Sequence, residues 1–437
     1  MEQYEVKTIA GQTKKKEITV CVPGSKSMTN RALLLATLAE GESKLNGVLF
    51  SDDSRYFMKC VQELGIPAQI DEEAKTIVLT GAGEQLPKDT ASLYVGSAGT
   101  AARFLTALLG ITPGHWELTA SEQMKKRPMG PLLSGLSKLG TSITFLENEN
   151  CFPFILDTTR VEQQEITINI DDSSQFLSAL LIACCRTNQD FTIHVEGSHG
   201  MAYIDMTTRM MQEFGVTAQK LEQDGHIRYL VSGGQQYKAR EYQIEPDLSA
   251  ACYFYAMAML LGIEITVAHV RKDTLQGDIQ LLQVFEQMGG KIKETEAGIA
   301  LQGPKDGILH GVTVDMHSFS DQAITLAAVA PFADSPTTIT GISHIRYQES
   351  NRIQAIVTEL TRLGVRCEEL EDGVRIYPGE VQAGTVQTYD DHRMAMGFSL
   401  LGLRTPGIVI DDPMCCRKTF ENYFEVLDEC CKELLER

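Results

Sequence analysis

Residues 133–156 read LSGLSKLGTSITFLENENCFPFIL, and this stretch contains the pattern on which the fold is built. A helical segment runs up to Gly140, and Gly is the residue most often found just after the end of a helix. Two short strand-like runs follow, at residues 141–147 and 151–157. The stretch therefore predicts a helix followed by a β-hairpin.

The same pattern occurs four more times along the chain. The corresponding glycines are Gly65, Gly215, Gly289 and Gly364, so the repeat is about 75 residues long by subtraction of these numbers. This period is longer than that of the usual solenoid repeats. One whole unit covers residues 91–157 and reads as strand, helix, strand, helix and hairpin. The sequence thus predicts a mixed α/β fold made of βαβαββ units.

The two ends of the chain indicate how the units are divided into domains. A helix is expected near residues 421–437 and the chain stops there without a hairpin, whereas two strand-like runs, at 3–10 and 16–22, precede the first unit. We expect this N-terminal hairpin to complete the last unit. One three-unit domain would cover residues 24–242 and the other 1–23 plus 243–437, with the active site in the cleft between them.

Composition narrows the class of protein. The 437 residues carry a net charge of −19, which argues against nucleic acid as the main partner because such binding needs surplus positive charge. No apolar run is long enough to cross a membrane, and the polar N-terminus lacks a signal-peptide core. Several of the 11 cysteines are adjacent pairs, unlike zinc ligands or a disulfide framework. We expect a cytoplasmic protein with reduced thiols and no metal.

Basic and small polar residues recur at the expected helix starts. In CVPGSKSMTNRALLLATLAEG, residues 21–41, two serines and Lys26 precede a helix that carries Arg31. Helix starts attract anions, and Arg binds carboxylate and phosphate in bidentate fashion. A single such Arg is more often a solvated or locally paired charge, but the repetition favours a site for two small anions. The set is Lys26, Arg31, Arg103, Arg127, Arg352, Arg393 and Lys418.

Several common catalytic motifs are absent from the sequence. It contains no GxxxxGK[ST] P-loop, no GxGxxG after a strand, no HExxH zinc pair and no GxSxG elbow. A P-loop NTPase, a Rossmann dehydrogenase, a zinc protease and an α/β-hydrolase are therefore disfavoured.

The motifs resemble, in order and over nearly the whole chain, those of the 5-enolpyruvylshikimate-3-phosphate (EPSP) synthase family. The matching stretches are PGSKSMTNRALLLATLAEG, GSAGTAARFL, KRPMGPLLSGLSKLG, SSQFLSALLIA, SDQAITLA, QESNRI, TYDDHRMAMGFSL and RKTFENYF. The resemblance implies a two-domain inside-out α/β barrel with three βαβαββ units in each domain. It also implies transfer of the enolpyruvyl group of phosphoenolpyruvate to the 5-hydroxyl of shikimate 3-phosphate, with release of phosphate, no cofactor, and a monomeric enzyme.

The resemblance further implies roles for individual residues. Asp321 would take the proton from the acceptor hydroxyl, Glu349 would protonate the methylene carbon of phosphoenolpyruvate, and Lys26 would contact both substrates; such chemistry needs an acid and a base held apart. The residues implied for shikimate 3-phosphate are Lys26, Ser27, Arg31, Ser173, Ser174, Gln175, Tyr203, Asp321 and Gln348. Those implied for phosphoenolpyruvate are Lys26, Gly99, Arg127, Gln175, Arg352, Arg393 and Lys418.

Four positions depart from the family pattern. Ser97 and His344 stand where the family usually has Asn, Gln348 where it has Lys, and Gly200 where it has Ser. Two alternatives therefore stay open, namely a related transferase with another hydroxyl acceptor and a non-catalytic anion-binding relative. The UDP-N-acetylglucosamine enolpyruvyl transferases usually carry a Cys in the loop that reads SEQMKKRPMG here, which counts against that acceptor. Retention of both Asp321 and Glu349 counts against a relative that binds anions without catalysis.

Overall fold

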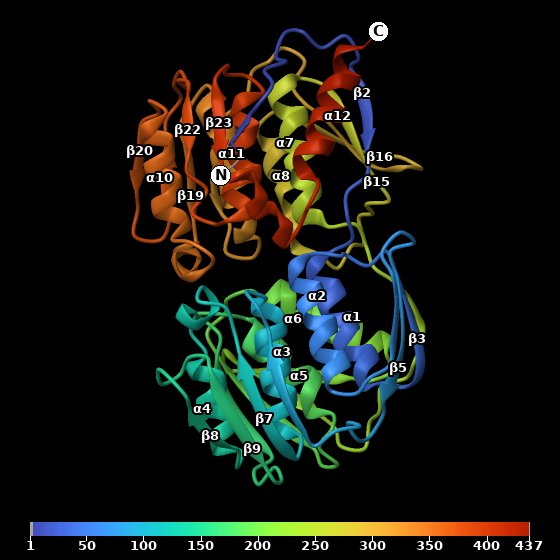
Figure 1. Ribbon diagram of the computed structural model, residues 1–437. Helices are drawn as coiled ribbons and strands as arrows, with labels where there is room; N and C mark the ends of the chain where they lie inside the picture. Colours follow the sequence, from blue (N-terminus) through green and yellow to red (C-terminus); the bar gives the residue numbers. More distant parts are fainter. Residues whose placement is uncertain (1–2, 437) are drawn as a thin grey trace. The chain divides into compact units, whose positions relative to one another are not determined.

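The computed structural model describes residues 3–436, which divide into two compact units. The continuous unit is Gly24–Ile244. The discontinuous unit combines the residues up to Pro23 with those from Glu245 onward. Figure 1 shows the ribbon of both units.

The segment around residues 133–156 forms the helix and hairpin that its sequence predicts. Helix α4 (Gly130–Lys138) ends before Gly140, whose φ of 105° lies in the left-handed region that Gly tolerates. Strands β8 (Ser142–Phe145) and β9 (Phe154–Thr158) then pair antiparallel. The rest of this βαβαββ unit is β6 (Thr90–Tyr94), α3 (Gly99–Ile111) and β7 (Gly114–Thr119), and its sheet has the order β6-β7-β9-β8.

The other two sheets of the continuous unit repeat this order, with one parallel pair followed by two antiparallel pairs. The second sheet is β10-β11-β13-β12 and the third is β14-β3-β5-β4. Their strands are β10 (Glu165–Asn169), β11 (Phe191–Glu196), β12 (Ala218–Gln223), β13 (His226–Val231), β14 (Glu241–Gln243), β3 (Glu40–Asn46), β4 (Ala68–Asp71) and β5 (Thr76–Ala82).

The discontinuous unit is built from sheets of the same kind. Its sheets are β16-β17-β15-β2, β18-β19-β21-β20 and a shorter one, β1-β23-β22. Their strands are β2 (Glu17–Val20), β15 (Glu264–Ala268), β16 (Lys291–Glu294), β17 (Gly298–Gln302), β18 (Thr313–Asp315), β19 (Thr337–Thr340), β20 (Cys367–Glu369), β21 (Val374–Ile376), β22 (Gly384–Val386), β23 (Ile408–Asp411) and β1 (Gln3–Glu5).

The prediction of an N-terminal hairpin is wrong, because the two strands join different sheets. Strand β1 pairs antiparallel with β23 in the last sheet, as expected of one half of the hairpin. Strand β2 instead pairs in parallel with β15. Strand β14, which precedes helix α7 (Leu248–Leu261), likewise pairs in parallel with β3, which follows helix α1 (Lys26–Leu38). The strands that precede α1 and α7 have thus exchanged sheets. Strand β2, before α1, joins the strand that follows α7, and β14, before α7, joins the strand that follows α1.

The first helix of each repeat is almost completely buried. In the continuous unit these helices are α1 (Lys26–Leu38), α3 and α5 (Gln175–Cys184), and in the discontinuous unit α7 (Leu248–Leu261), α9 (Ala323–Val329) and α11 (His392–Gly402). Every residue of α3 and α11 is buried. A helix that is apolar all round belongs in a core, and Figure 1 shows sheets on the outside of these helices. This is the inside-out arrangement of the predicted fold class.

The second helix of each repeat buries only one face. These helices are α2 (Asp52–Glu63), α4, α6 (Met201–Glu213), α8 (Gln280–Gln287), α10 (Arg352–Arg362) and α12 (Tyr423–Leu435). Short 3-10 turns, η1 to η6, cover Met124–Lys126, Gly277–Ile279, Ser320–Gln322, Ala330–Phe332, Ser343–Tyr347 and Pro413–Lys418. Within residues 3–436 no helix combines the length and the apolar character that a membrane crossing requires.

Candidate active site

Three of the buried helices begin at a side-chain cap. Ser25 Oγ accepts the backbone N–H of Met28 at the start of α1, over 3.4 Å. Asp247 does the same for Ala250 at α7, and Asp391 for Arg393 at α11. These caps satisfy N–H groups that helix starts leave open. They fix the backbone beside several of the residues expected to bind substrate.

Lys26 and Ser27 are the first two residues of α1, and both are half-buried. The Lys26 ammonium lies 3.6 Å from a carboxylate oxygen of Asp53, on α2. The two helices thus hold the lysine at the start of α1 rather than leaving it extended into water.

Arg31 is buried and hydrogen-bonds to groups within its own unit. Its guanidinium donates to Thr207 Oγ1 at 2.8 Å and to Ser178 Oγ at 3.2 Å. It also donates to the backbone carbonyls of Ser27 and Tyr203, whose ring it faces. Burial lowers the pKa of Arg31 to about 10. The side chain therefore ties α1 to α5 and α6.

A second group surrounds the starts of α3 and α5. Arg103 donates to Gln175 Oε1 at 2.8 Å, and the amide of Gln175 donates to Thr100 Oγ1 at 3.3 Å. Gly99 is the first residue of α3, and a Cβ added there would lie 2.5 Å from Nη1 of Arg127. It would also lie 2.8 Å from Nη1 of Arg103. The absent side chain at Gly99 thus lets two guanidinium groups approach the helix start.

The start of α5 also explains one departure from the family pattern. Ser173 Oγ accepts the N–H of Gln175 at 3.3 Å, and buried Ser174 is the N-cap residue of α5. Gly200 has a φ of 67°, and a Cβ there would lie 2.4 Å from Ser174 Oγ. A serine at position 200 therefore does not fit this backbone. A second departure, Ser97, shares a 2.8 Å hydrogen bond with Ser121.

In the discontinuous unit, Arg352 is the centre of a network of carboxylates. This first residue of α10 donates through Nε to Asp391 Oδ2 at 2.8 Å. Its Nη2 donates to Glu349 Oε2 at 2.9 Å and its Nη1 to Asp321 Oδ1 at 3.1 Å. Nη1 also contacts Gln348 Oε1. Burial favours the neutral form, but the three carboxylates outweigh it and raise the pKa of Arg352 above its ordinary value.

Arg393, the second residue of α11, extends this network. It donates to the other oxygen of Asp321 at 2.9 Å and to Ser249 Oγ at 3.3 Å. Ser249 and Gln322 in turn donate to Asp278. Burial, and next the charge of Asp321, raise the pKa of Asp278 to about 6.

Two further residues, the expected ligand Lys418 and His344 from the departures, make other contacts. Lys418 is the last residue of η6 and donates to the backbone carbonyl of Asp390 at 2.9 Å and to its carboxylate at 3.3 Å. His344, in η5, is buried and shares a 2.7 Å hydrogen bond between Nε2 and Ser320 Oγ.

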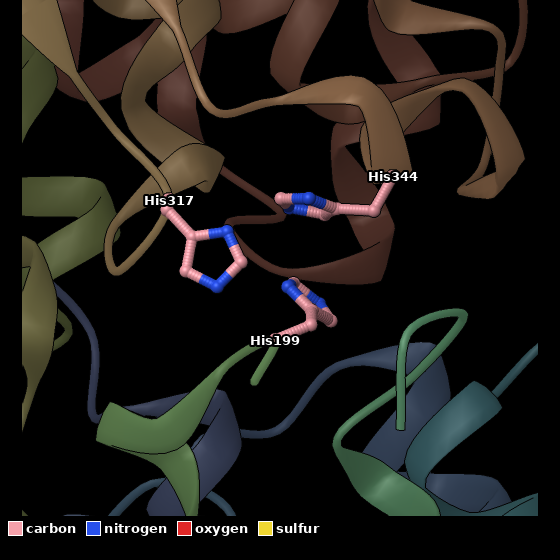
Figure 2. A group of neighbouring side chains, drawn as sticks. All are labelled: His199, His317 and His344. Carbon is pink, nitrogen blue, oxygen red and sulfur yellow. The ribbon is translucent and has the colours of Figure 1, made fainter. Parts of the chain in front are cut away.

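Figure 2 shows His344 with His317 of the same unit; the third labelled side chain, His199, belongs to the continuous unit. The rings of His317 and His344 meet edge to face, with their centroids 5.8 Å apart. Two imidazoles do not by themselves complete a zinc site, which takes three or four protein ligands.

The structure therefore forms two groups from the expected residues. Lys26, Ser27, Arg31, Gly99, Arg127, Ser173, Ser174, Gln175 and Tyr203 belong to the continuous unit, and Asp321, Gln348, Glu349, Arg352, Arg393 and Lys418 to the discontinuous unit. Sequence reasoning did not select Asp391, Asp278 or Ser249. The DDHR run that contains Asp391 offered a signal, namely an acidic residue directly before a helix whose second residue is Arg393.

Comparisons with known proteins agree with the fold. A solved structure of EPSP synthase from Acinetobacter baumannii superposes with a TM-score of 0.81, at 24% identity, and covers 98% of each chain. At that identity the likeness concerns the fold alone. It places the chain in the class of two-domain inside-out α/β proteins with three repeats in each domain.

Sequence relatives define the family. The family model described as EPSP synthase (3-phosphoshikimate 1-carboxyvinyltransferase) matches residues 11–427. The 3-phosphoshikimate 1-carboxyvinyltransferase of Trichormus variabilis is 45% identical over 93% of this chain and 95% of its own length. A Halalkalibacterium halodurans relative, named 3-phosphoshikimate 1-carboxyvinyltransferase 2, is 40% identical over 94% and 91%. The chain belongs to the EPSP synthase family, whose members are enolpyruvyl transferases of the shikimate pathway.

Proposed function

We propose that this protein transfers the enolpyruvyl group of phosphoenolpyruvate to the 5-hydroxyl of shikimate 3-phosphate and releases phosphate. Family membership over residues 11–427 supports the reaction. The observation that carries the assignment of roles is that two carboxylates, Asp321 and Glu349, hydrogen-bond to one buried guanidinium, that of Arg352. A protein that only binds anions has no use for such a pair.

The reaction is an addition followed by an elimination. Asp321 takes the proton of the acceptor hydroxyl, whose oxygen bonds to C2 of phosphoenolpyruvate, and Glu349 gives a proton to C3. The resulting tetrahedral adduct then loses phosphate and a proton from the new methyl group, which restores the double bond. General acid–base catalysis of this kind contributes about 10²–10⁴-fold to a rate.

The cationic side chains bind phosphoenolpyruvate in this proposal. Arg352, Arg393 and Lys418 serve from the discontinuous unit, and Arg127, Gln175 and Lys26 from the continuous unit, with Gly99 leaving room at the start of α3. Arg352 and Arg393 are already held by carboxylates. An incoming carboxylate or phosphate group would therefore share these guanidinium donors with Asp321 and Glu349.

Shikimate 3-phosphate is assigned to the serines and amides of the helix starts. Ser27, Ser173, Ser174, Gln175, Lys26 and Tyr203 bind it, together with Asp321 and Gln348. Arg31 supports this side by holding the backbone of Ser27 and Tyr203 in place. The role of Gln348 is the least usual, because its amide oxygen contacts Arg352, whereas a lysine there would repel that guanidinium.

The function is tested by phosphate release from phosphoenolpyruvate, with and without shikimate 3-phosphate. Release only when both substrates are present is the expected result. A transferase with another acceptor is the second candidate, favoured by Gln348 and His344. It would bind phosphoenolpyruvate but release no phosphate with shikimate 3-phosphate, and that outcome would overturn the proposed acceptor.

A further inference from the structure

The discontinuous unit contains a cavity for which neither the proposed reaction nor the family comparison supplies a role. Its volume is about 490 Å³, within the usual range of small-molecule sites. The lining comes from the N-terminal loop, the end of α7, the end of β17 with the loop after it, and the segment just after α11. It comprises Ala10, Gly11, Lys16, Leu260, Leu261, Gly262, Gln302, Pro304, Lys305, Gly307 and Arg404.

The charges on this lining are all positive. Lys16, Lys305 and Arg404 line the cavity, and no carboxylate is among its lining residues. In a chain with a net charge of −19, such a group of cations is a local exception. A cavity of one charge sign concentrates ions of the opposite sign.

Arg404 has the geometry of a residue that lacks its polar partner. Its guanidinium lies over the ring of Phe332, 4.8 Å from the centroid. Within residues 3–436 its side chain makes no hydrogen bond or ion pair, and burial lowers its pKa. Contact with the ring holds the guanidinium group in place and leaves its N–H donors available for a carboxylate or phosphate.

The negative ends of nearby helices offset only part of this positive charge. The cavity lies at the C-terminal ends of α7 and α11, and each helix end carries about half a negative charge. Two such ends offset about one of the three cations. A surplus of about two positive charges is left, which matches an anion with two charges.

The cavity is separate from the proposed active site. Ser249, the second residue of helix α7, accepts a hydrogen bond from Arg393 of the proposed site. The last two residues of the same helix line the cavity. The helix has 14 residues, so its two ends are about 20 Å apart. A ligand of ordinary metabolite size cannot reach both.

We propose that this cavity binds a small organic anion with at least two negative charges and an apolar body. Lys16, Lys305 and Arg404 bind the anionic groups. Leu260, Leu261 and Pro304 provide the apolar wall against which the body packs. The anionic groups are carboxylates or phosphates, since both accept the paired N–H donors of Arg404.

The test measures binding of two probes to the full chain by calorimetry at low ionic strength. Phthalate carries two carboxylates on a ring, and phenyl phosphate carries one phosphate dianion on a ring. Wild type is compared with Lys305→Gln/Arg404→Gln. The matched control is Lys291→Gln/Lys293→Gln, which removes two exposed charges from β16 in the same unit. Benzoate and inorganic phosphate test the need for a second charge and for an apolar body.

We expect at least one ring probe to bind wild type about tenfold or more tightly than the cavity variant, because two charge-assisted contacts are lost. The probe that loses most affinity identifies carboxylate or phosphate as the preferred group. The control variant should bind like wild type, and both variants should keep wild-type phosphate release.

Three outcomes would overturn the proposal: no binding of either ring probe, equal affinity in wild type and cavity variant, or equal loss in the control. If Arg404→Gln disturbs folding, Lys305→Glu, at an exposed position, replaces it and is compared with Lys293→Glu. Charge reversal at 305 alone must then weaken binding more than charge reversal at 293.

Discussion

Arg352 shows how much one side chain can determine in this protein. Its guanidinium hydrogen-bonds to Asp391, Glu349 and Asp321 in a place almost closed to solvent. Replacing Arg352 by Met should leave these carboxylates facing one another and lower the free energy of unfolding by about 3–5 kcal/mol. Urea denaturation measures the change. Arg366→Met breaks an exposed pair with Glu368 and should lower the free energy of unfolding far less, because an exposed ion pair contributes little. Equal losses in the two variants would contradict the role of burial.

The two carboxylates assigned to proton transfer should be separable from binding. Asp321→Ala and Glu349→Gln should each lower the turnover number about a hundredfold or more, because an acid or a base is lost. Steady-state phosphate release measures turnover. Glu380→Gln, an exposed change in the same unit, should turn over like wild type. Near-wild-type rates in both site variants would remove the assigned roles.

Gly99 should be sensitive to a single methyl group. The Cβ of Gly99→Ala would lie 2.5 Å from Arg127 Nη1 and 2.8 Å from Arg103 Nη1, so both guanidinium groups must move. We expect the KM for phosphoenolpyruvate to rise about tenfold or more, because displaced binding groups lose affinity steeply. Gly379→Ala, where nothing lies within 4 Å of the added Cβ, should leave the KM unchanged. An unchanged KM in Gly99→Ala would argue against Arg127 as a ligand.

The residues themselves were only partly predictable from sequence. The motif positions could be selected by resemblance, and their roles stay predictions. The partners of Arg352 and Arg393 were less accessible, because Asp391 and Asp278 are ordinary acidic residues whose importance comes from burial. Gly200 became understandable only when its backbone angle and its distance from Ser174 were known.

Helix α1 gives a prediction at the level of secondary structure. Ser25 caps the helix that begins with Lys26, and Ser25→Ala should lower its local stability by about 1 kcal/mol. Hydrogen exchange of residues 24–38 should be faster by about fivefold, with other helices unchanged. Ser134→Ala, an exposed change within α4, is the control. Unchanged exchange at α1 would show that packing, not the cap, holds the helix start.

The repeat predicted most elements, because a helix, its terminal Gly and the following hairpin are encoded by local pattern. The pairing of β2 with β15 and of β14 with β3 was not predictable in this way. A strand's own residues specify which face is buried, but not which sheet edge receives it. That choice depends on where the chain passes between the units.

At the scale of the whole discontinuous unit, Asp278 predicts a dependence of stability on pH. Its pKa rises from the ordinary 3.8 to about 6 on folding, so the folded state holds a proton that the unfolded state has lost. This contribution is fully present below about pH 4 and is lost as the pH rises to about 6. The neighbouring charges are Asp321, which raises the pKa, and Arg393, which lowers it.

The variant Asp278→Asn mimics the protonated form at every pH. Its free energy of unfolding relative to wild type should therefore increase between pH 4 and pH 7, as measured by urea denaturation. Asp273→Asn, an exposed change in the same unit, should show no such trend. A difference between Asp278→Asn and wild type that does not vary with pH would contradict the raised pKa.

The exchange of strands at the crossing points has a consequence for synthesis on the ribosome. The continuous unit has all its strands once residue 244 has been made, but β2 needs β15, and β1 needs β23 near the end of the chain. At ~5–20 residues per second, β2 waits on the order of 10 to 50 s for its partner. The first strands to leave the ribosome thus wait longest for their partners, and during that interval they depend on their exposed, charged residues to stay clear of other nascent chains.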